Sequence, residues 1–183
     1  GVMVQRCKWC NVKNELYVKY HDTEFGVPVL DERYIFEMFI LETFQAGLSW
    51  ECVLNKRLDF EVAFDYFDID KICEYDEVKI TELLTNPRLI RNKLKMKAVV
   101  NNAKIYRGIV KSFGSFDVYL KSFAGDKVIY EVGPTTSPLS DKISADLKSR
   151  GMKFVGSTTV YSFLQAIGII YAHDENCYKY RKN

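Results

Sequence analysis

The sequence lacks the features that mark membrane and secreted proteins. None of its apolar runs approaches the roughly 18 to 20 residues that a helix needs to span a bilayer. Its N-terminus shows no charged segment followed by an apolar one, so no signal peptide is visible. We therefore expect a cytoplasmic protein without a membrane partner.

The sequence also lacks an excess of charge of either sign. Its 26 basic and 24 acidic residues leave a formal charge of +2 at pH 7, which argues neither for nor against nucleic acid as a partner. Any basic surface must therefore be local. With 183 residues, 48% of them hydrophobic, and no internal repeat or low-complexity linker, the chain predicts one globular domain over residues 1–183.

Cysteine is scarce, and its count is odd. Five cysteines at irregular spacing fit reduced thiols, and a metal site, better than a disulfide framework. Cys52 and Cys73 are interpreted as small buried hydrophobic residues. The other three are Cys7, Cys10 and Cys177.

Apolar residues recur at helical spacing along nearly the whole chain. We predict a buried helix from an N-cap at Asp31 to Gly47 and amphipathic helices over 96–110 and 160–167. Shorter helices are predicted at about 50–65, 69–85, 115–123 and 139–150. Residues 124–138 should form an irregular loop or a short strand pair. The predicted fold class is all-α.

Metal-binding residue types gather near the two ends of the chain. His173 and Cys177 lie four residues apart, so both can face one ion, and Cys7, Cys10 and His21 lie near the other end. A closed tetrahedral zinc site takes four such ligands, and five candidates compete for them. Spacing alone does not exclude Cys10, because Cys7 and Cys10 form a Cys-x-x-Cys pair. The alternative is a set of unrelated histidines and cysteines.

The segment "LETFQAGLSW" (41–50) places a glutamate inside a very apolar helix. A charged Glu42 in these surroundings is unfavourable unless it meets a partner, so it either faces solvent or is held for a ligand.

Several motifs occur together with this segment: "RCKW" near the start, "YVKYHDTEFGVP" at 17–28, "RGMKFVG" at 150–156 and "YSFLQAIG" at 161–168. With these motifs in this order, the chain resembles the DNA-3-methyladenine glycosylase I family over practically its whole length. The resemblance implies a helix-hairpin-helix fold and excision of 3-methyladenine from alkylated double-stranded DNA. It also implies one structural zinc that joins segments 5–21 and 173–177, with ligands Cys7, His21, His173 and Cys177 and with Cys10 outside the set.

The stretch 147–163 fits the hairpin of such a fold. Gly151 would end one helix, Gly156 would allow a close approach, and Ser157 or Thr158 would cap the next helix. Backbone N–H groups there would bind a DNA phosphate, and Lys153 is expected to add local positive charge together with Lys148 and Arg150. Taken alone, the stretch is an ordinary helical turn.

The resemblance also implies a base pocket. It places Glu42 as the hydrogen-bond acceptor, surrounded by Trp9, Tyr17, Tyr20 and Trp50, although each aromatic residue taken singly is more often core. A base must leave the duplex to be reached. The 3-methyladenine nucleotide carries a positive charge that an aromatic face and a carboxylate both favour.

The chemistry expected from the resemblance is hydrolysis without strand cleavage. No acidic residue follows the hairpin before Asp174, and no lysine is placed to form a Schiff base, so binding and orientation should dominate. Leu48, after Gly47, is a candidate for the apolar wedge that fills the gap in the stack, with buried packing as the alternative.

Two residues depart from the family pattern. Phe25 stands where tryptophan is common and Phe44 where some members are polar, so both are expected to reshape the pocket.

Two other functions remain open. One is an inactive DNA-binding module of the same fold, and the other is a zinc hydrolase, which would need an open metal position. Nothing visible demands a dimer, and a monomer is expected.

Overall fold

The protein is described by a computed structural model that covers residues 3–183, so the first two residues of the predicted 1–183 domain lie outside the described residues. The prediction of an all-α fold is confirmed. The helices are α1 (Glu15–Thr23), α2 (Glu32–Phe44), α3 (Trp50–Asn55), α4 (Arg57–Ala63), the 3-10 helix η1 (Asp65–Phe67), α5 (Ile69–Cys73), α6 (Glu77–Thr85), α7 (Lys93–Phe113), α8 (Phe116–Ala124), α9 (Pro138–Ser149) and α10 (Ser157–Ala166). Two short strands, β1 (Ile129–Tyr130) and β2 (Ile170–Tyr171), complete the described elements.

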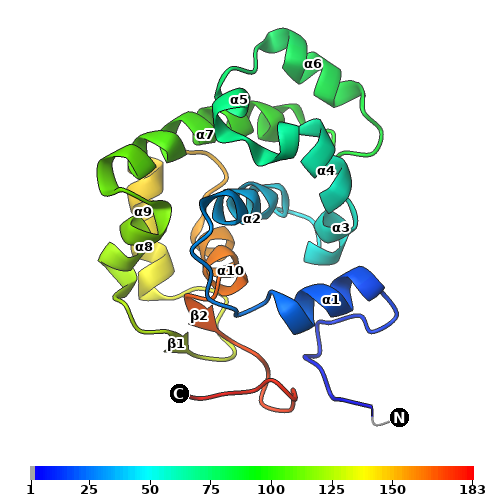
Figure 1. The fold of residues 1–183 in the computed structure, drawn as a ribbon, viewed down its shortest axis with the longest axis vertical. Helices are drawn as coiled ribbons and strands as arrows, with labels where there is room; N and C mark the ends of the chain where they lie inside the picture. The colour runs from blue at the N-terminus through cyan, green and yellow to red at the C-terminus, as the bar shows by residue number, and fades with distance from the viewer. Residues whose placement is uncertain (1–2) are drawn as a thin grey trace.

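Helix α2 forms the centre of the molecule, with the other helices arranged around it (Figure 1). Asp31 caps it as predicted, because its side chain accepts a hydrogen bond from the backbone N–H of Tyr34 at 3.1 Å. Every residue from Ile35 to Phe44 is buried. A helix that is buried on all sides must leave its polar residues either paired within the protein or facing an internal cavity.

Two of the shorter predicted helices are each divided in two. The 50–65 helix breaks at Lys56 into α3 and α4, and the 69–85 helix breaks between Cys73 and Glu77 into α5 and α6. Asp76 starts α6 by accepting a hydrogen bond from the backbone N–H of Lys79 at 2.9 Å. Apolar spacing continues across these breaks, which is why periodicity alone did not reveal them.

The loop at 124–138 does not contain a strand pair of its own. Instead, β1 pairs in parallel with β2, with Ile129 opposite Ile170. The prediction of a local pair was wrong because the partner strand comes from the segment after α10. This pairing brings the residues that follow β1 against the C-terminal segment.

Gly168 fixes the path of the chain into β2. Its φ is +80°, and a Cβ atom there would lie 2.2 Å from the backbone nitrogen of Pro28. Only glycine allows this approach. The segment after α10 is therefore held against the segment after α1.

The segment that precedes α1, from residue 3 onward, and the C-terminal segment lie at the same end of the molecule (Figure 1). Within residues 3–183, no helix combines the length and the apolar character needed to cross a membrane.

Candidate functional site

Two glutamates of α2 are buried, and their surroundings differ. The side chain of Glu37 is paired, because Arg57 donates to its carboxylate at 3.0 and 3.3 Å and Arg33 donates at 3.4 Å. Glu42 is equally buried, with 2% of its surface exposed, yet its Oε2 atom has no hydrogen-bond partner. Of the two alternatives drawn from the sequence, solvent exposure is therefore wrong for Glu42.

Glu42 lines a cavity of about 350 Å³. All four aromatic side chains predicted to surround the base contribute to the same cavity, although they come from the N-terminal segment, α1 and α3. The lining residues are Trp9, Tyr17, Tyr20, Phe25, Glu42, Gln45, Trp50, Val132, Gly133, Ser162, Gln165, Ala172 and Asp174. The volume lies in the range of about 300–1,000 Å³ that is usual for small-molecule sites.

Aromatic rings form one continuous wall of this cavity. The ring centroid of Trp9 lies 5.2 Å from that of Tyr17 and 4.9 Å from that of Phe25, and Tyr20 lies 5.4 Å from Trp50. Such rings offer their faces to a flat or cationic ligand. The wall can therefore present ring faces and edges to a planar or cationic molecule in the cavity.

Two unpaired polar atoms belong to this cavity. Among the buried side-chain nitrogen and oxygen atoms of residues 3–183, those without a partner are Glu42 Oε2, Trp50 Nε1 and the Tyr106 hydroxyl. Glu42 and Trp50 line the same cavity. One acceptor and one donor are thus left for a ligand, because buried polar groups are otherwise almost always paired.

Burial changes the ionisation of the cavity wall. It raises the pKa of Glu42 well above the usual value of a carboxyl group, with no compensating charge beside it. Burial also raises the pKa of Tyr17 to about 12 and that of Tyr20 well above its ordinary value. Both tyrosines are therefore neutral at physiological pH, and burial favours the protonated, neutral form of Glu42.

Sequence reasoning missed several polar residues of the wall. Gln45 extends α2, and Ser162 and Gln165 lie three residues apart on α10. Their signal was available, because they are polar positions in the apolar motif "YSFLQAIG". Val132 and Gly133 follow β1 and reach the cavity through the strand pairing, which no local pattern reveals.

The two departures from the family pattern have different positions. Phe25 lines the cavity, as expected. Phe44 does not; it is fully buried, with its ring 4.8 Å from that of Phe60. The expectation that Phe44 reshapes the pocket is wrong, because its position on α2 turns it into the core instead.

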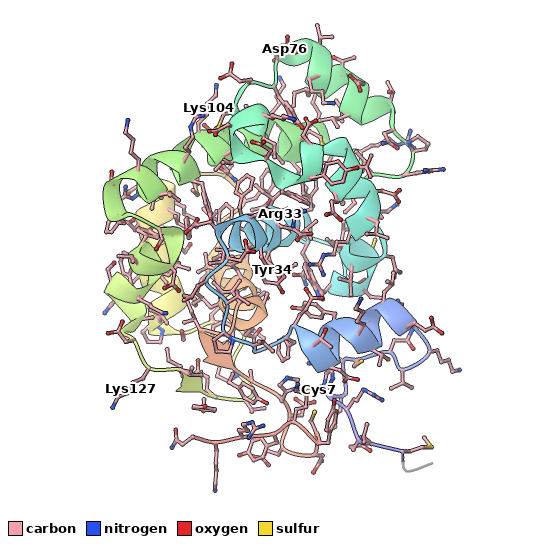
Figure 2. All side chains as sticks on the ribbon, in the orientation of Figure 1. Cys7, Arg33, Tyr34, Asp76, Lys104 and Lys127 are labelled. Atoms are coloured by element: carbon pink, nitrogen blue, oxygen red, sulfur yellow. The ribbon has the colours of Figure 1, made fainter. Side chains whose placement is uncertain are left out.

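The predicted metal-ligating residues form one buried cluster. The ligand atoms of Cys7, His21, His173 and Cys177 all lie within 4.8 Å of one another. His173 Nδ1 lies 3.4 Å from Cys7 Sγ and 3.5 Å from Cys177 Sγ, and His21 Nε2 lies 3.4 Å from Cys177 Sγ. Figure 2 shows Cys7 between α1 and the C-terminal segment. This group could hold a metal ion.

Neighbouring groups orient both imidazole rings of the cluster. His173 Nε2 donates to the carbonyl oxygen of Phe25 at 3.0 Å, and His21 Nδ1 donates to the carboxylate of Asp22 at 2.7 Å, which Arg6 also contacts. The other nitrogen of each ring is thereby left as a lone-pair donor toward the cluster. Burial lowers the pKa of His173 to about 4, so its ring is neutral, the form that binds metals.

The remaining cysteines lie outside this cluster. Cys10 is buried nearby, and its backbone N–H donates to the Cys7 carbonyl at 3.0 Å, but its thiol is not part of the group. Cys73 is buried, as predicted. Cys52 is only half-buried, because it lies in the short helix α3 at the surface.

The predicted hairpin joins α9 to α10. Gly151 adopts a φ of +99° at the end of α9, as expected. The prediction that Ser157 or Thr158 caps α10 was wrong: Gly156 occupies the N-cap position without a side-chain hydrogen bond. The Ser157 hydroxyl instead donates to Asp141 at 2.6 Å. The first backbone N–H groups of α10 therefore have no side-chain cap, and a Cβ on Gly156 would meet nothing within 4 Å.

Charge near the hairpin is smaller than the sequence suggests. Arg150 is bound to Asp146 at 2.8 Å, so its charge is partly compensated. Lys148 and Lys153 are exposed, and no carboxylate of residues 3–183 lies within 4.0 Å of either ammonium.

Leu48 lies on an exposed turn that joins α2 to α3. Gly47 has a φ of +78°, and the backbone N–H of Leu48 contacts the Gln45 carbonyl. Leu48 is 39% exposed, which is inconsistent with the alternative of buried packing. Its function as a wedge stays a prediction.

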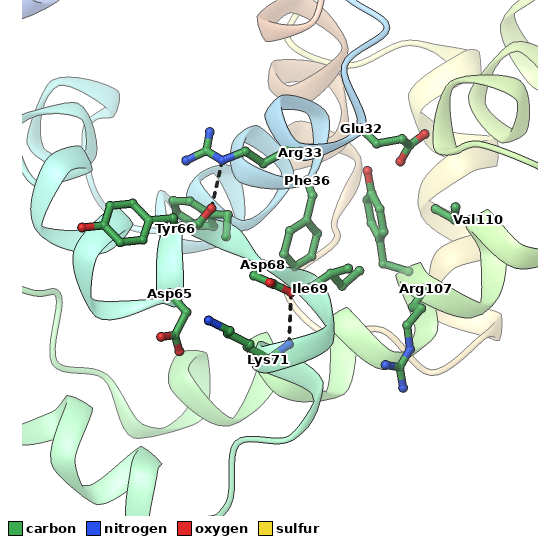
Figure 3. A pocket seen from close by; sticks show the side chains of 12 residues that line it. Glu32, Arg33, Phe36, Asp65, Tyr66, Asp68, Ile69, Lys71, Arg107 and Val110 are labelled. Atoms are coloured by element: carbon green, nitrogen blue, oxygen red, sulfur yellow. Dashed lines mark hydrogen bonds between the residues drawn. The ribbon is translucent and has the colours of Figure 1, made fainter.

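A second cavity of about 570 Å³ lies at the opposite end of α2 (Figure 3). Its wall combines apolar side chains such as Phe36 with charged ones. Both arginines of the wall already form ion pairs within the protein: Arg107 is bound to Asp70 at 3.0 Å and Arg33 to Glu61 at 2.6 Å. None of the site residues predicted from the sequence lines this cavity.

Comparison with known proteins agrees with this geometry. A model of the methyladenine glycosylase family matches residues 9–180. The chain belongs to this family. It is 38% identical over 181 residues to DNA-3-methyladenine glycosylase of Haemophilus influenzae, a match that covers 96% of this chain and 97% of the relative. It is 37% identical to DNA-3-methyladenine glycosylase 1 of Escherichia coli, over 98% and 99% of the two chains.

A solved structure also has the same fold. The 3-methyladenine DNA glycosylase I of Staphylococcus aureus, studied for its recognition of 3-methyladenine, superposes with a TM-score of 0.90 at 33% identity. The match covers 98% of this chain and all of the other. The chain therefore shares the fold of this family, and its matches cover 97% or more of these three relatives.

Proposed function

We propose that this protein is a DNA glycosylase that hydrolyses the N-glycosidic bond of 3-methyladenine in alkylated double-stranded DNA. The observation that carries the proposal is the pair of unpaired polar atoms, Glu42 Oε2 and Trp50 Nε1, in one aromatic cavity. The edge of an adenine base offers a donor and an acceptor, and it matches this pair. A flipped base would complete the hydrogen bonding that the protein leaves open.

Selectivity for the methylated base follows from charge. The 3-methyladenine nucleotide is a cation, whereas unmodified adenine is neutral. A cation over the faces of Trp9, Tyr17 and Trp50 is favoured by up to about 2 kcal/mol when desolvated, and its approach also favours the carboxylate form of Glu42. Neutral adenine gains neither contribution. The cavity therefore binds the damaged base more tightly without needing to recognise the methyl group itself.

The reaction needs little further help from the protein. The bond between the sugar C1′ atom and the base nitrogen breaks, its electron pair moves onto the cationic base, and the base leaves as a neutral molecule. A water oxygen adds to C1′ and loses a proton, which leaves an abasic site. Among the described residues, no lysine lines the cavity, which supports hydrolysis without a Schiff base or strand cleavage.

The metal cluster fits one structural zinc. A tetrahedral zinc with bonds of about 2.3 Å to sulfur and about 2.0–2.1 Å to nitrogen places these ligand atoms about 3.5 Å apart, close to the 3.4 and 3.5 Å found between the sulfur and nitrogen atoms. Cys7, His21, His173 and Cys177 would hold the ion, which would join the two ends of the chain. Two cysteine and two histidine ligands, all buried, leave no open position, which argues against a zinc hydrolase.

The hairpin and the Leu48 turn would contact the duplex. The uncapped start of α10, with Gly151, Gly156, Ser157 and Thr158 near it, is suited to a phosphate, and Lys153 adds positive charge. Leu48 would enter the gap that the flipped base leaves. The monomeric state and the cytoplasmic location expected from the sequence stay predictions.

The test is release of free 3-methyladenine from methylated duplex DNA. The wild-type protein should release it, and Glu42→Gln should release it far more slowly. Glu51→Gln is the matched control, because Glu51 lies beside Trp50 but outside the cavity wall, bound to Asn11 at 3.0 Å. An inactive DNA-binding module of this fold would bind the duplex and release no base, and that result would refute the proposal.

A further inference from the structure

Lys95 is a buried lysine that lies apart from the cavity. It projects from the first turn of α7, and only 7% of its surface is exposed. Its ammonium group donates to the carbonyl oxygens of Phe44, at 2.9 Å, and Ala46, at 2.6 Å. No carboxylate of residues 3–183 lies within 4.0 Å of it. A buried lysine without an acidic partner is rare, so its bonds to these two carbonyls need an explanation.

The two carbonyl groups belong to the end of α2 and to the turn that follows it. The last carbonyls of a helix have no partner within the helix, and they carry the negative end of its dipole. Helix α2 has no basic residue of its own in its last turn. Lys95 belongs to α7, and it supplies the positive charge at the C-terminal end of α2. The turn it holds carries Leu48.

The same face of α7 also holds the hairpin. Asn102 is fully buried; its amide donates to the Lys153 carbonyl at 2.8 Å and its oxygen accepts from the Lys153 backbone N–H at 2.9 Å. Asn101 donates to the Gly151 carbonyl at 2.9 Å. Lys95 and Asn102 are seven residues apart, or two turns, which is about 10 Å along the axis. One rigid helix thus sets the spacing between the Leu48 turn and the hairpin.

We propose that Lys95 is a positioning residue for DNA binding, which holds the Leu48 turn in register with the hairpin so that both engage one duplex. The inference rests on the proposed function, since it assigns the turn and the hairpin to the DNA interface. It does not place Lys95 in contact with the base. Lys95 should therefore affect the DNA complex and leave the base cavity intact.

The experiment compares Lys95→Met with Lys104→Met. Both changes remove one positive charge from α7, but Lys104 is exposed farther along the helix (Figure 2). We expect Lys95→Met to weaken binding to an abasic-site duplex by about tenfold or more, as for loss of hydrogen bonds from a charged group. Binding of free 3-methyladenine, followed by tryptophan fluorescence, should stay within about twofold of the wild type. Lys104→Met should change neither.

Two further measurements separate positioning from stability. With 2-aminopurine opposite the abasic site, saturating Lys95→Met should give a smaller fluorescence rise than the wild type, because the wedge no longer unstacks the base. In a double-mutant cycle, Leu48→Ala should add less than about twofold to the loss caused by Lys95→Met, since both act through one turn. If Lys95→Met does not fold, Lys95→Gln, which keeps one donor group, should show an intermediate loss.

The outcomes are distinguishable from failure of the proposed function. If the wild-type protein releases no 3-methyladenine and binds no abasic duplex, the glycosylase proposal fails. If the wild type does both, while Lys95→Met binds abasic DNA like Lys104→Met, the positioning proposal is overturned. Additive effects of Lys95→Met and Leu48→Ala, or a neutral Leu48→Ala, would overturn it as well.

Discussion

Replacing Glu42 by glutamine tests the site most directly. The two side chains have nearly the same shape, so the cavity keeps its volume while the carboxylate is lost. Glu42 Oε2 has no partner in the protein, so no other protein contact is removed. A hydrogen bond to a charged group contributes about 1.5–3 kcal/mol. The rate at which 3-methyladenine is released from methylated duplex DNA should therefore fall by about 10- to 150-fold.

The pH dependence gives a second, independent readout. Because burial raises the pKa of Glu42 well above its usual value, lowering the pH keeps this carboxyl protonated. A protonated Glu42 does not attract a cation, so the wild-type rate of base release from methylated DNA, where the base is cationic, should rise as the pH rises through this raised pKa. Tyr17 and Tyr20 remain neutral over the same range. The profile of Glu42→Gln should be flat.

Replacing Glu42 by glutamine should raise the free energy of unfolding, although it lowers activity. The carboxyl of Glu42 ionises at about pH 4.3 in the unfolded chain and at a higher pH in the folded protein. Between these two values the folded state binds more protons, so the free energy of unfolding falls as the pH rises. Glutamine does not ionise, so Glu42→Gln does not undergo this fall in the free energy of unfolding. At pH 7 to 8 it should unfold at a higher denaturant concentration than the wild type.

The assays are single-turnover release of 3-methyladenine from methylated duplex DNA, in which the damaged base is still cationic, and urea unfolding, each at a series of pH values. Asp174→Asn controls for the other carboxylate of the cavity wall, and its pH profile should keep the wild-type shape. A Glu42→Gln variant that releases the base at the wild-type rate and with wild-type pH dependence would refute the assignment of Glu42.

Other predictions test the remaining parts. Metal analysis should return one zinc per chain, retained in Cys10→Ala and lost in His173→Ala, because only the latter removes a member of the buried cluster. Binding to abasic DNA should weaken in Leu48→Ala; unchanged affinity would exclude Leu48 as the wedge. Gly168→Ala should destabilise the fold by about 3 kcal/mol or more in urea unfolding, because its Cβ would collide with the backbone at Pro28. A Gly168→Ala protein as stable as the wild type would show that the backbone segments at Gly168 and Pro28 can move apart to admit the Cβ atom.

Much of the fold was predictable because its signals are local. Asp31 and the apolar residues after it define α2 in the sequence, and the structure has the predicted N-cap but ends the helix at Phe44, before Gly47. The breaks at Lys56 and before Asp76 were missed, since apolar spacing continues through them. The pairing of Ile129 with Ile170 was missed because it joins segments 41 residues apart in sequence order, 170 minus 129. Local patterns carry no information on such partners.

The candidate site was predictable where residue type is distinctive. Glutamate in an apolar helix and histidine four residues before cysteine are unusual enough to be noticed in the sequence. Ser162 and Gln165 are common residues, and their position on the cavity wall depends on how α10 packs against α2. Ser157 has a residue type that favours helix caps, yet a neighbouring carboxylate, Asp141, takes its hydroxyl. Propensity was overridden there by a tertiary contact.

The contrast between Glu37 and Glu42 explains why the site lies where it does. Both are buried on one helix, but two arginines neutralise Glu37, and that pairing serves the fold. Glu42 has neither a cation nor a full set of hydrogen bonds, so its burial destabilises the free protein. The same absence leaves its carboxyl free to pair with a cation. A cationic base in the cavity would neutralise Glu42 as Arg57 neutralises Glu37. If the proposed function holds, an arginine placed beside Glu42 would remove the charge selectivity, so we propose that the unpaired state of Glu42 is itself the functional feature.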